Sequence, residues 1–88
     1  MDQTDYQIVE RADGSWLIDG QYSLIDFEKF FDFDISYQNK NFTTLAGLIL
    51  HQSGYIPNVG DTVTVEKLRL EVVDKDGQRI DKVLVSRI

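Results

Sequence analysis

The sequence predicts an α+β domain in which an antiparallel sheet packs against two helices. Two stretches, beginning at residue 24 and at about residue 44, repeat apolar residues with a helical period, whereas the residues after Pro57 alternate apolar and polar positions as half-buried strands do. Asp-Gly pairs stand between the strand-like runs, where tight turns are needed. The expected order of elements is therefore ββααβββ, with the helices on one side of the sheet.

The first expected element is a β-hairpin. Residues 8–12 and 15–19 flank Asp13-Gly14, a dipeptide that supplies the positive φ angles of a two-residue hairpin turn. Asp19-Gly20 ends the second strand. A short strand bounded by these two Asp-Gly pairs delivers the chain into the helix that follows.

A capping signal marks the start of the first helix. Ser23 with Asp26 three positions later resembles a capping box, so we expect the helix to begin at Leu24. Leu24, Phe27 and Phe31 then fall within one narrow arc, which should face the core.

The second helix is expected at about residues 44–53. Its apolar residues cover more than half of its circumference, which predicts a helix that is almost wholly enclosed. Gly54 is expected to end it in the left-handed conformation.

Three strands are expected after Pro57. Asp76-Gly77 predicts a second hairpin turn, and residues 79–87 form the last strand. The strands before that turn are indicated by alternating apolar positions, at Val63, Val65, Leu68, Leu70 and Val72.

Size and composition exclude several classes of protein. The 88 residues make one domain, with residues 1–7 as a polar linker or flexible terminus and residues 8–88 as the folded unit. There is no cysteine, so disulfides, thiolate metal sites and thiol nucleophiles are absent. Fifteen acidic against nine basic residues give a net charge of −6, which disfavours nucleic acid. The longest apolar run, residues 45–50, is too short to cross a bilayer.

Three long stretches of this sequence resemble the CorC/HlyC transporter-associated domain in order and spacing. They are "DGSWLIDGQYSLIDFEKFF", "TLAGLILHQSGYIPNVGD" and "LRLEVVDKDGQRIDKVLVSR". The resemblance implies a cytoplasmic, C-terminal module of hemolysin-like proteins of the inner or plasma membrane, which carry a transmembrane region and a pair of CBS domains before it. It also implies a link to magnesium and cobalt efflux or resistance, and a fold close to a unit of FAD-binding enzymes.

Acidic residues at two places are candidate ligands for a divalent cation. Asp32 and Asp34 alternate with phenylalanines in "FFDFDI", which would expose paired carboxylates while the rings enter the core. Asp74 and Asp76 lie in "DKDGQRID", which lacks the bidentate Glu of a calcium loop and reads mainly as a hairpin. His51 is the only histidine, and we expect it to interact favourably with the carbonyl groups at the C-terminal end of the second helix.

The sequence carries no sign of catalytic machinery. No serine has a G-x-S-x-G setting, and the glycines are scattered rather than gathered in a phosphate-binding loop. No cofactor is expected, and FAD rests on fold analogy alone. Large side chains near turns are instead candidates for binding a partner, namely Trp16, Tyr22, Ile25 and Tyr55.

Two functions are therefore carried forward. The first is a non-catalytic regulatory or assembly module of a membrane-bound magnesium or cobalt transport protein, which packs against its own CBS pair, another subunit as in a homodimer, or a cytosolic partner. The alternative is a ligand-binding module for a divalent cation or an adenine-containing cofactor such as FAD.

Overall fold

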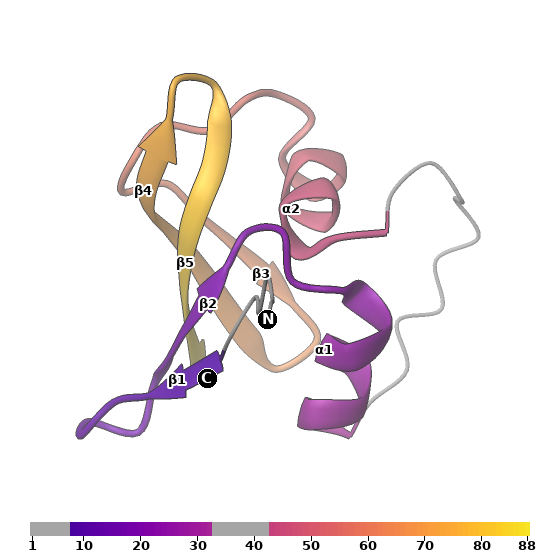
Figure 1. The fold of residues 1–88 in the computed structure, drawn as a ribbon, viewed down its shortest axis with the longest axis vertical. Helices are drawn as coiled ribbons and strands as arrows, with labels where there is room; N and C mark the ends of the chain where they lie inside the picture. Colours follow the sequence, from indigo (N-terminus) through magenta and orange to yellow (C-terminus); the bar gives the residue numbers. More distant parts are fainter. Residues whose placement is uncertain (1–7, 33–42) are drawn as a thin grey trace, which may run out of the picture.

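The computed structural model describes residues 8–32 and 43–88, and within them the elements follow the expected ββααβββ order (Figure 1). The predicted linker at residues 1–7 lies outside the described residues. The elements are β1 (Ile8–Glu10), β2 (Trp16–Asp19), α1 (Leu24–Phe31), α2 (Leu45–Ser53), β3 (Thr62–Val65), β4 (Leu68–Asp76) and β5 (Arg79–Arg87).

All five strands form one antiparallel sheet in the order β1-β2-β5-β4-β3. The last strand of the chain is thus the middle strand, with β2 on one side and β4 on the other. Trp16 pairs with Val85 and Asp19 with Lys82, so strands from opposite ends of the sequence lie side by side. Pairing between strands that are distant in the sequence therefore holds the sheet together, in addition to the hairpin pairings.

Both helices cover one face of the sheet, to its right in Figure 1. Ile18, Val83 and Val72 are paired across three strands and are fully buried under the helices. Residues one position along, such as Leu17 and Leu84, point to the other face and are half-buried. This alternation is the period of two that the sequence pattern indicates.

The cap at Ser23 forms where the sequence predicts it, whereas Thr44, expected as the first residue of the second helix, caps that helix instead. The Ser23 hydroxyl accepts a long hydrogen bond of 3.5 Å from the amide of Asp26, and the Thr44 hydroxyl accepts one of 3.1 Å from Gly47. Ser23 and Thr44 also face each other in an isolated β-bridge, so the two helices begin at the same point. Gly54 ends α2 at φ 75°, as expected.

The second helix is less enclosed than its composition predicts. Leu45, Leu48 and Ile49 are almost fully buried, but Leu50 is 38% exposed and His51 is exposed. Because α2 packs on the sheet with one face only, its apolar arc is wider than the contact it makes.

No helix within residues 8–32 and 43–88 is long and apolar enough to span a bilayer.

The first hairpin turn differs from the expected two-residue turn. The strands end at Glu10 and Trp16, and the Gly14 amide donates to the carbonyl of Arg11 at 3.1 Å. Gly14 has φ 86°, but Asp13 does not have a positive φ, so the prediction of two such residues is wrong. Instead, the Asp13 carboxylate accepts hydrogen bonds from the amide (3.0 Å) and hydroxyl (2.6 Å) of Ser15.

These bonds predict a pH-dependent contribution of Asp13 to stability. They lower the pKa of Asp13 below its ordinary value of 3.8, the side-chain bond to Ser15 being the largest cause. A lowered pKa in the folded state means that the contribution is present above pH 3.8 and is lost as pH falls through the lower value. We expect Asp13→Ala to lower the unfolding midpoint in denaturant at neutral pH, with the difference from wild type shrinking as pH falls below 3.8. A constant difference across this range would contradict the assignment.

Gly20 is required by close packing rather than by its backbone angle. It follows β2, its amide donates to the Asp81 carbonyl at 2.9 Å, and its carbonyl accepts from Ala46 at 2.8 Å. A Cβ placed on Gly20 would lie 2.2 Å from the carbonyl oxygen of Ile80, which belongs to the backbone and cannot swing aside. This position therefore joins β2, β5 and the start of α2 with no room for a side chain.

Replacing Gly20 tests this junction. We expect Gly20→Ala to lower the free energy of unfolding by about 2–3 kcal/mol, because the backbone of β5 must move. Gly54→Ala is the matched control: its Cβ would meet open space, so it should cost only about 1 kcal/mol for the left-handed conformation. Urea denaturation followed by Trp16 fluorescence measures both, and equal costs for the two variants would refute the steric explanation.

Candidate interaction site

Trp16 belongs to an aromatic cluster built between β2 and the end of α1. Its ring lies 4.9 Å from that of Phe31, at an interplanar angle of 90°, and 6.2 Å from that of Phe30. Phe27 is fully buried against Phe31, whereas Phe30 is 49% exposed. The cluster thus runs from the core to the surface.

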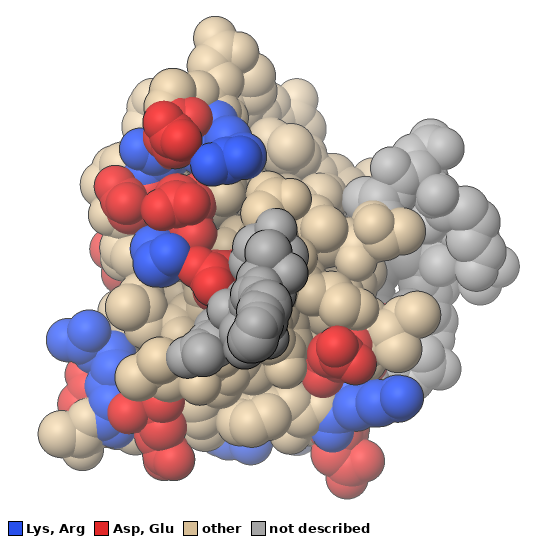
Figure 2. All heavy atoms as spheres, viewed as in Figure 1, with Lys and Arg blue, Asp and Glu red and all other residues tan. Residues whose placement is uncertain are grey.

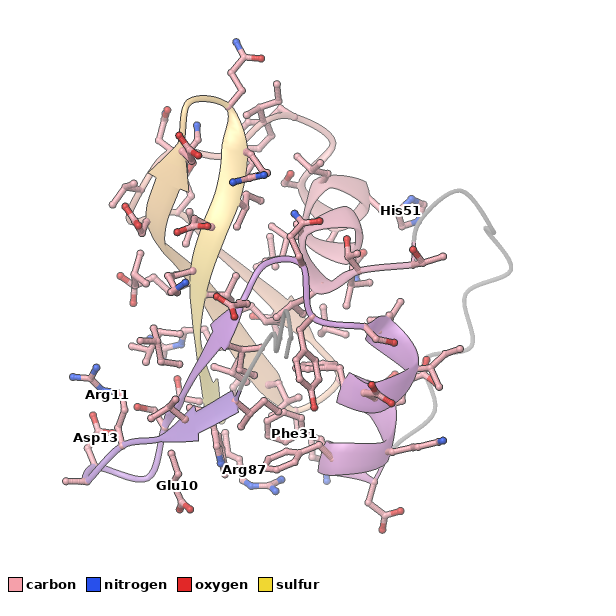
Figure 3. All side chains as sticks on the ribbon, viewed as in Figure 1. Glu10, Arg11, Asp13, Phe31, His51 and Arg87 are labelled. Atoms are coloured by element: carbon pink, nitrogen blue, oxygen red, sulfur yellow. The ribbon has the colours of Figure 1, made fainter. Side chains whose placement is uncertain are left out.

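Arg87, at the end of β5, lies over this cluster. The guanidinium carbon is 5.4 Å from the centre of the Trp16 ring and 5.7 Å from that of Phe31, and Figure 3 shows Arg87 beside Phe31 at the foot of the sheet. Both distances are within the range of cation–π attraction. The Trp16–Val85 pairing places Arg87 there, two residues beyond Val85 on the same face of the strand.

A surface depression of about 280 Å³ opens next to Arg87. It is lined by Phe31, Glu66, Lys67 and Arg87, and we call these four residues the Arg87 niche. Leu68 pairs with Arg87 at the start of β4, which brings the β3–β4 turn, residues 66–67, against the end of β5. This volume is below the usual range for ligand pockets of 300–1,000 Å³, so the niche is smaller than a dinucleotide such as FAD requires.

Two residues at the niche have a strained backbone: Glu66 lines it, and Asp32 directly follows Phe31 of the lining. Asp32, which caps α1 directly after Phe31, has φ 56°, and Glu66 has φ 55°. Within residues 8–32 and 43–88 these are the two residues other than glycine with positive φ. The left-handed conformation costs such residues about 1–2 kcal/mol, and strain of this kind often occurs at functional sites.

The predicted partner-binding residues do not form one surface. Ile25 is 64% exposed on α1 and Tyr55 is 58% exposed after α2, whereas Trp16 and Tyr22 are half-buried against the core. Burial raises the pKa of Tyr22, with a smaller effect from the carboxylate of Asp26. Of the four, Trp16 belongs to the aromatic cluster described above, and their roles as binding residues stay predictions.

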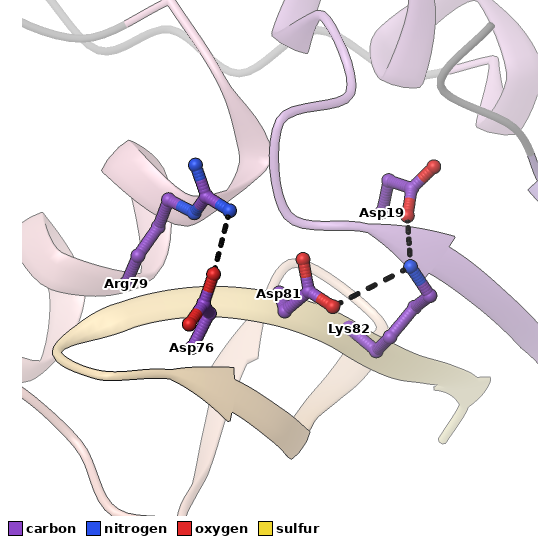
Figure 4. A network of polar contacts seen from close by, with 5 residues as sticks. All are labelled: Asp19, Asp76, Arg79, Asp81 and Lys82. Atoms are coloured by element: carbon purple, nitrogen blue, oxygen red, sulfur yellow. Dashed lines mark hydrogen bonds and ion pairs between the residues drawn. The ribbon is translucent and has the colours of Figure 1, made fainter.

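The two predicted pairs of metal ligands lie in different parts of the chain, and one member of the first pair is not described. Asp32 is exposed at the end of α1, and Asp74 and Asp76 lie on β4, near the other hairpin; Asp34 lies outside the described residues. Asp76 binds Arg79 at 3.1 Å (Figure 4), and Asp74 stands opposite Lys82. Within the described ranges, no three His, Asp or Glu side chains gather as a metal site would require.

Lys82 makes the shortest ion pair among the described residues. Its ammonium lies 2.5 Å from the Asp19 carboxylate and 3.7 Å from that of Asp81, in a contact that ties β5 to β2 (Figure 4). The hydrogen bond that the Lys82 ammonium donates to the Asp19 carboxylate raises the pKa of Lys82. Figure 2 shows acidic and basic side chains interleaved over the β4–β5 hairpin on the face in view. The basic residues Arg79 and Lys82 of this hairpin are thus paired with neighbouring aspartates.

Sequence reasoning missed the cationic half of this site. Arg87, Lys67 and Glu66 carry no motif, and they meet because of strand order, which residue spacing does not reveal. The one available signal was Phe30, a large aromatic residue next to Phe31 in the expected helix.

The fold and the Arg87 niche together define a small two-layer α+β domain with an aromatic and arginine cluster at one end. The chain belongs to the transporter associated domain family, CorC_HlyC, whose family profile matches residues 9–88.

Relatives and a solved structure place the chain in context. It is 42% identical to a UPF0053 protein of Synechocystis and 40% identical to the polyamine export protein of Escherichia coli K12, each over 93% of this chain. It spans 19% and 18% of those two proteins. A CorC_HlyC domain of a Xylella fastidiosa hemolysin, solved with Mg²⁺ and Mn²⁺, is 38% identical with a TM-score of 0.81 over 92% of this chain and 96% of that one.

The strained turn at the niche can be tested on stability. We expect Glu66→Asn to raise the free energy of unfolding by about 0.5 kcal/mol, because Asn adopts the left-handed conformation at lower cost than Glu. Lys67→Asn, one position along and without a positive φ, should give no such gain. Chemical denaturation measures both, and a loss of stability in Glu66→Asn would show that the turn is not strained.

Proposed function

We propose that this chain is a regulatory and assembly module of a membrane-bound cation exporter and acts by contact rather than by catalysis. The observation that carries the proposal is the aromatic and arginine cluster at the surface, where Trp16 and Arg87 meet outside the buried core. Tryptophan and arginine are the residues most enriched at the energetic centres of protein interfaces.

Family membership supports the transport context. The Escherichia coli relative is named for polyamine export, and the family resemblance implies magnesium or cobalt. Polyamines and these metal ions share a multivalent positive charge, so we take the cargo class to be multivalent cations, with magnesium and cobalt as the metal candidates. In the parent protein the module would sit on the cytoplasmic side and pack against the CBS pair or a second subunit.

A second candidate function is cation sensing by the domain itself. The Xylella fastidiosa domain, 38% identical to this chain, was solved with Mg²⁺ and Mn²⁺. In this chain Asp32 with Asp34, or Asp74 with Asp76, would supply the oxygen ligands. A rise in melting temperature in millimolar Mg²⁺ that Asp32→Asn abolishes would favour this candidate, because a ligand of the folded state stabilises it.

Deleting the domain tests the assembly function. We expect a parent protein that lacks the segment equivalent to residues 9–88 to insert into the membrane but to show altered subunit assembly and altered cation export. Size-exclusion chromatography with light scattering, and export from loaded vesicles, measure the two effects. The matched control is the parent with Arg69→Ala, a change of an exposed arginine on the opposite face of the sheet, which should behave as wild type. Unchanged assembly and unchanged export after deletion would refute the proposal.

A further inference from the structure

We infer that the Arg87 niche binds a carboxylate group presented by a partner polypeptide next to an apolar side chain. This inference rests on the proposed function, because it names the chemistry of the partner that the module contacts.

The cations of the niche have no anionic partner within the described part of the chain. The protein carries fifteen acidic residues and a net charge of −6, yet no described carboxylate lies within ion-pair distance of Arg87 or Lys67. Arg79 and Lys82, by contrast, are both paired with aspartates. Other exposed cations of the described residues, such as Arg11 and Arg69, also lack a carboxylate at ion-pair distance, but Arg87 and Lys67 lie together in one surface depression, where a single anion can contact both.

The aromatic rings hold the guanidinium ready for that anion. Contacts with Trp16 and Phe31 restrain Arg87 and reduce the entropy that it would lose on binding. A guanidinium presents N–H donors in a planar fork, which matches the two oxygens of a carboxylate, while the ammonium of Lys67 adds a second charge.

The size and lining of the niche favour a side chain over a free cofactor. About 280 Å³ accommodates a carboxylate and a few methylene groups, and the exposed edge of Phe30 beside Phe31 offers apolar contact next to it. Glu66 is the one acidic residue of the lining, so the four residues carry a local charge of +1. An acidic residue flanked by apolar ones fits this combination.

A pair of capped peptides tests the inference on the 88-residue chain. The probes are N-acetyl-Leu-Glu-Leu-amide and N-acetyl-Leu-Gln-Leu-amide, which differ only in the carboxylate. We expect the Glu peptide to shift the indole N–H resonance of Trp16 and the amides of residues 66–67 in a saturable way in ¹⁵N NMR titrations. The Gln peptide should bind at least about tenfold more weakly, because a charge-assisted bidentate contact is replaced by a neutral one.

Variants assign the contact to its residues. Arg87→Ala should weaken Glu-peptide binding by about tenfold or more, and Arg87→Lys, which keeps the charge but loses the fork, should weaken it by a smaller factor. Glu66→Gln should strengthen it, because a like charge is removed. Arg69→Ala, on the opposite face of the sheet, should leave it unchanged. Each variant is checked for a native spectrum first, and Arg87→Lys decides if Arg87→Ala does not fold.

Three results would overturn the inference: no saturable shift with the Glu peptide, equal binding of the two peptides, or undiminished binding by the Arg87 variants. None of these results would refute the proposed assembly function, which the deletion experiment tests separately. Conversely, if deletion of the domain leaves assembly and export unchanged while the chain still binds the Glu peptide selectively through Arg87, the carboxylate site is supported and its proposed role in assembly is refuted.

Discussion

The pairing of β2 with β5 is the contact on which the rest of this structure depends. It joins residues 16–19 to residues 82–85 across almost the whole length of the chain and makes the last strand the centre of the sheet. The pairing needs Gly20, whose backbone lies against that of Ile80, and it carries the Asp19–Lys82 ion pair at its edge. Without it, β1 and β2 would have no sheet to join.

The same pairing also creates the candidate site. Trp16 lies on β2, Phe31 ends α1, and Arg87 ends β5, so the three meet only when the first hairpin is docked on the last strand. Of the two rings below Arg87, Phe31 belongs to the core and Trp16 packs against it, whereas the cations above lack carboxylate partners among the described residues. Charges without such partners above packed aromatic rings are suited to binding another protein. The chain also belongs to a family of transporter associated domains, which is consistent with such a role.

Local features of this fold were predictable from the sequence, and long-range ones were not. Ser23 caps α1 and Gly54 ends α2 because these signals depend on a few neighbouring residues, and the exposure of Ile25 follows from the helical period. The turn at Asp13-Gly14 was predicted with the wrong geometry, because the Asp13 carboxylate bonds to Ser15 and stabilises a longer loop. The meeting of Trp16 with Arg87 depends on strand order, which no local pattern encodes.

The central claim is that the end of the domain carrying Arg87 is covered by another part of the parent protein. Hydrogen–deuterium exchange tests it most directly, by comparing the isolated chain with the same residues inside the full-length parent. The account predicts slower exchange in the parent at residues 66–68 and 86–88, and unchanged exchange at Gly77 in the β4–β5 turn. If the amides of residues 66–68 and 86–88 exchange as fast in the parent protein as in the isolated chain, the claim is contradicted.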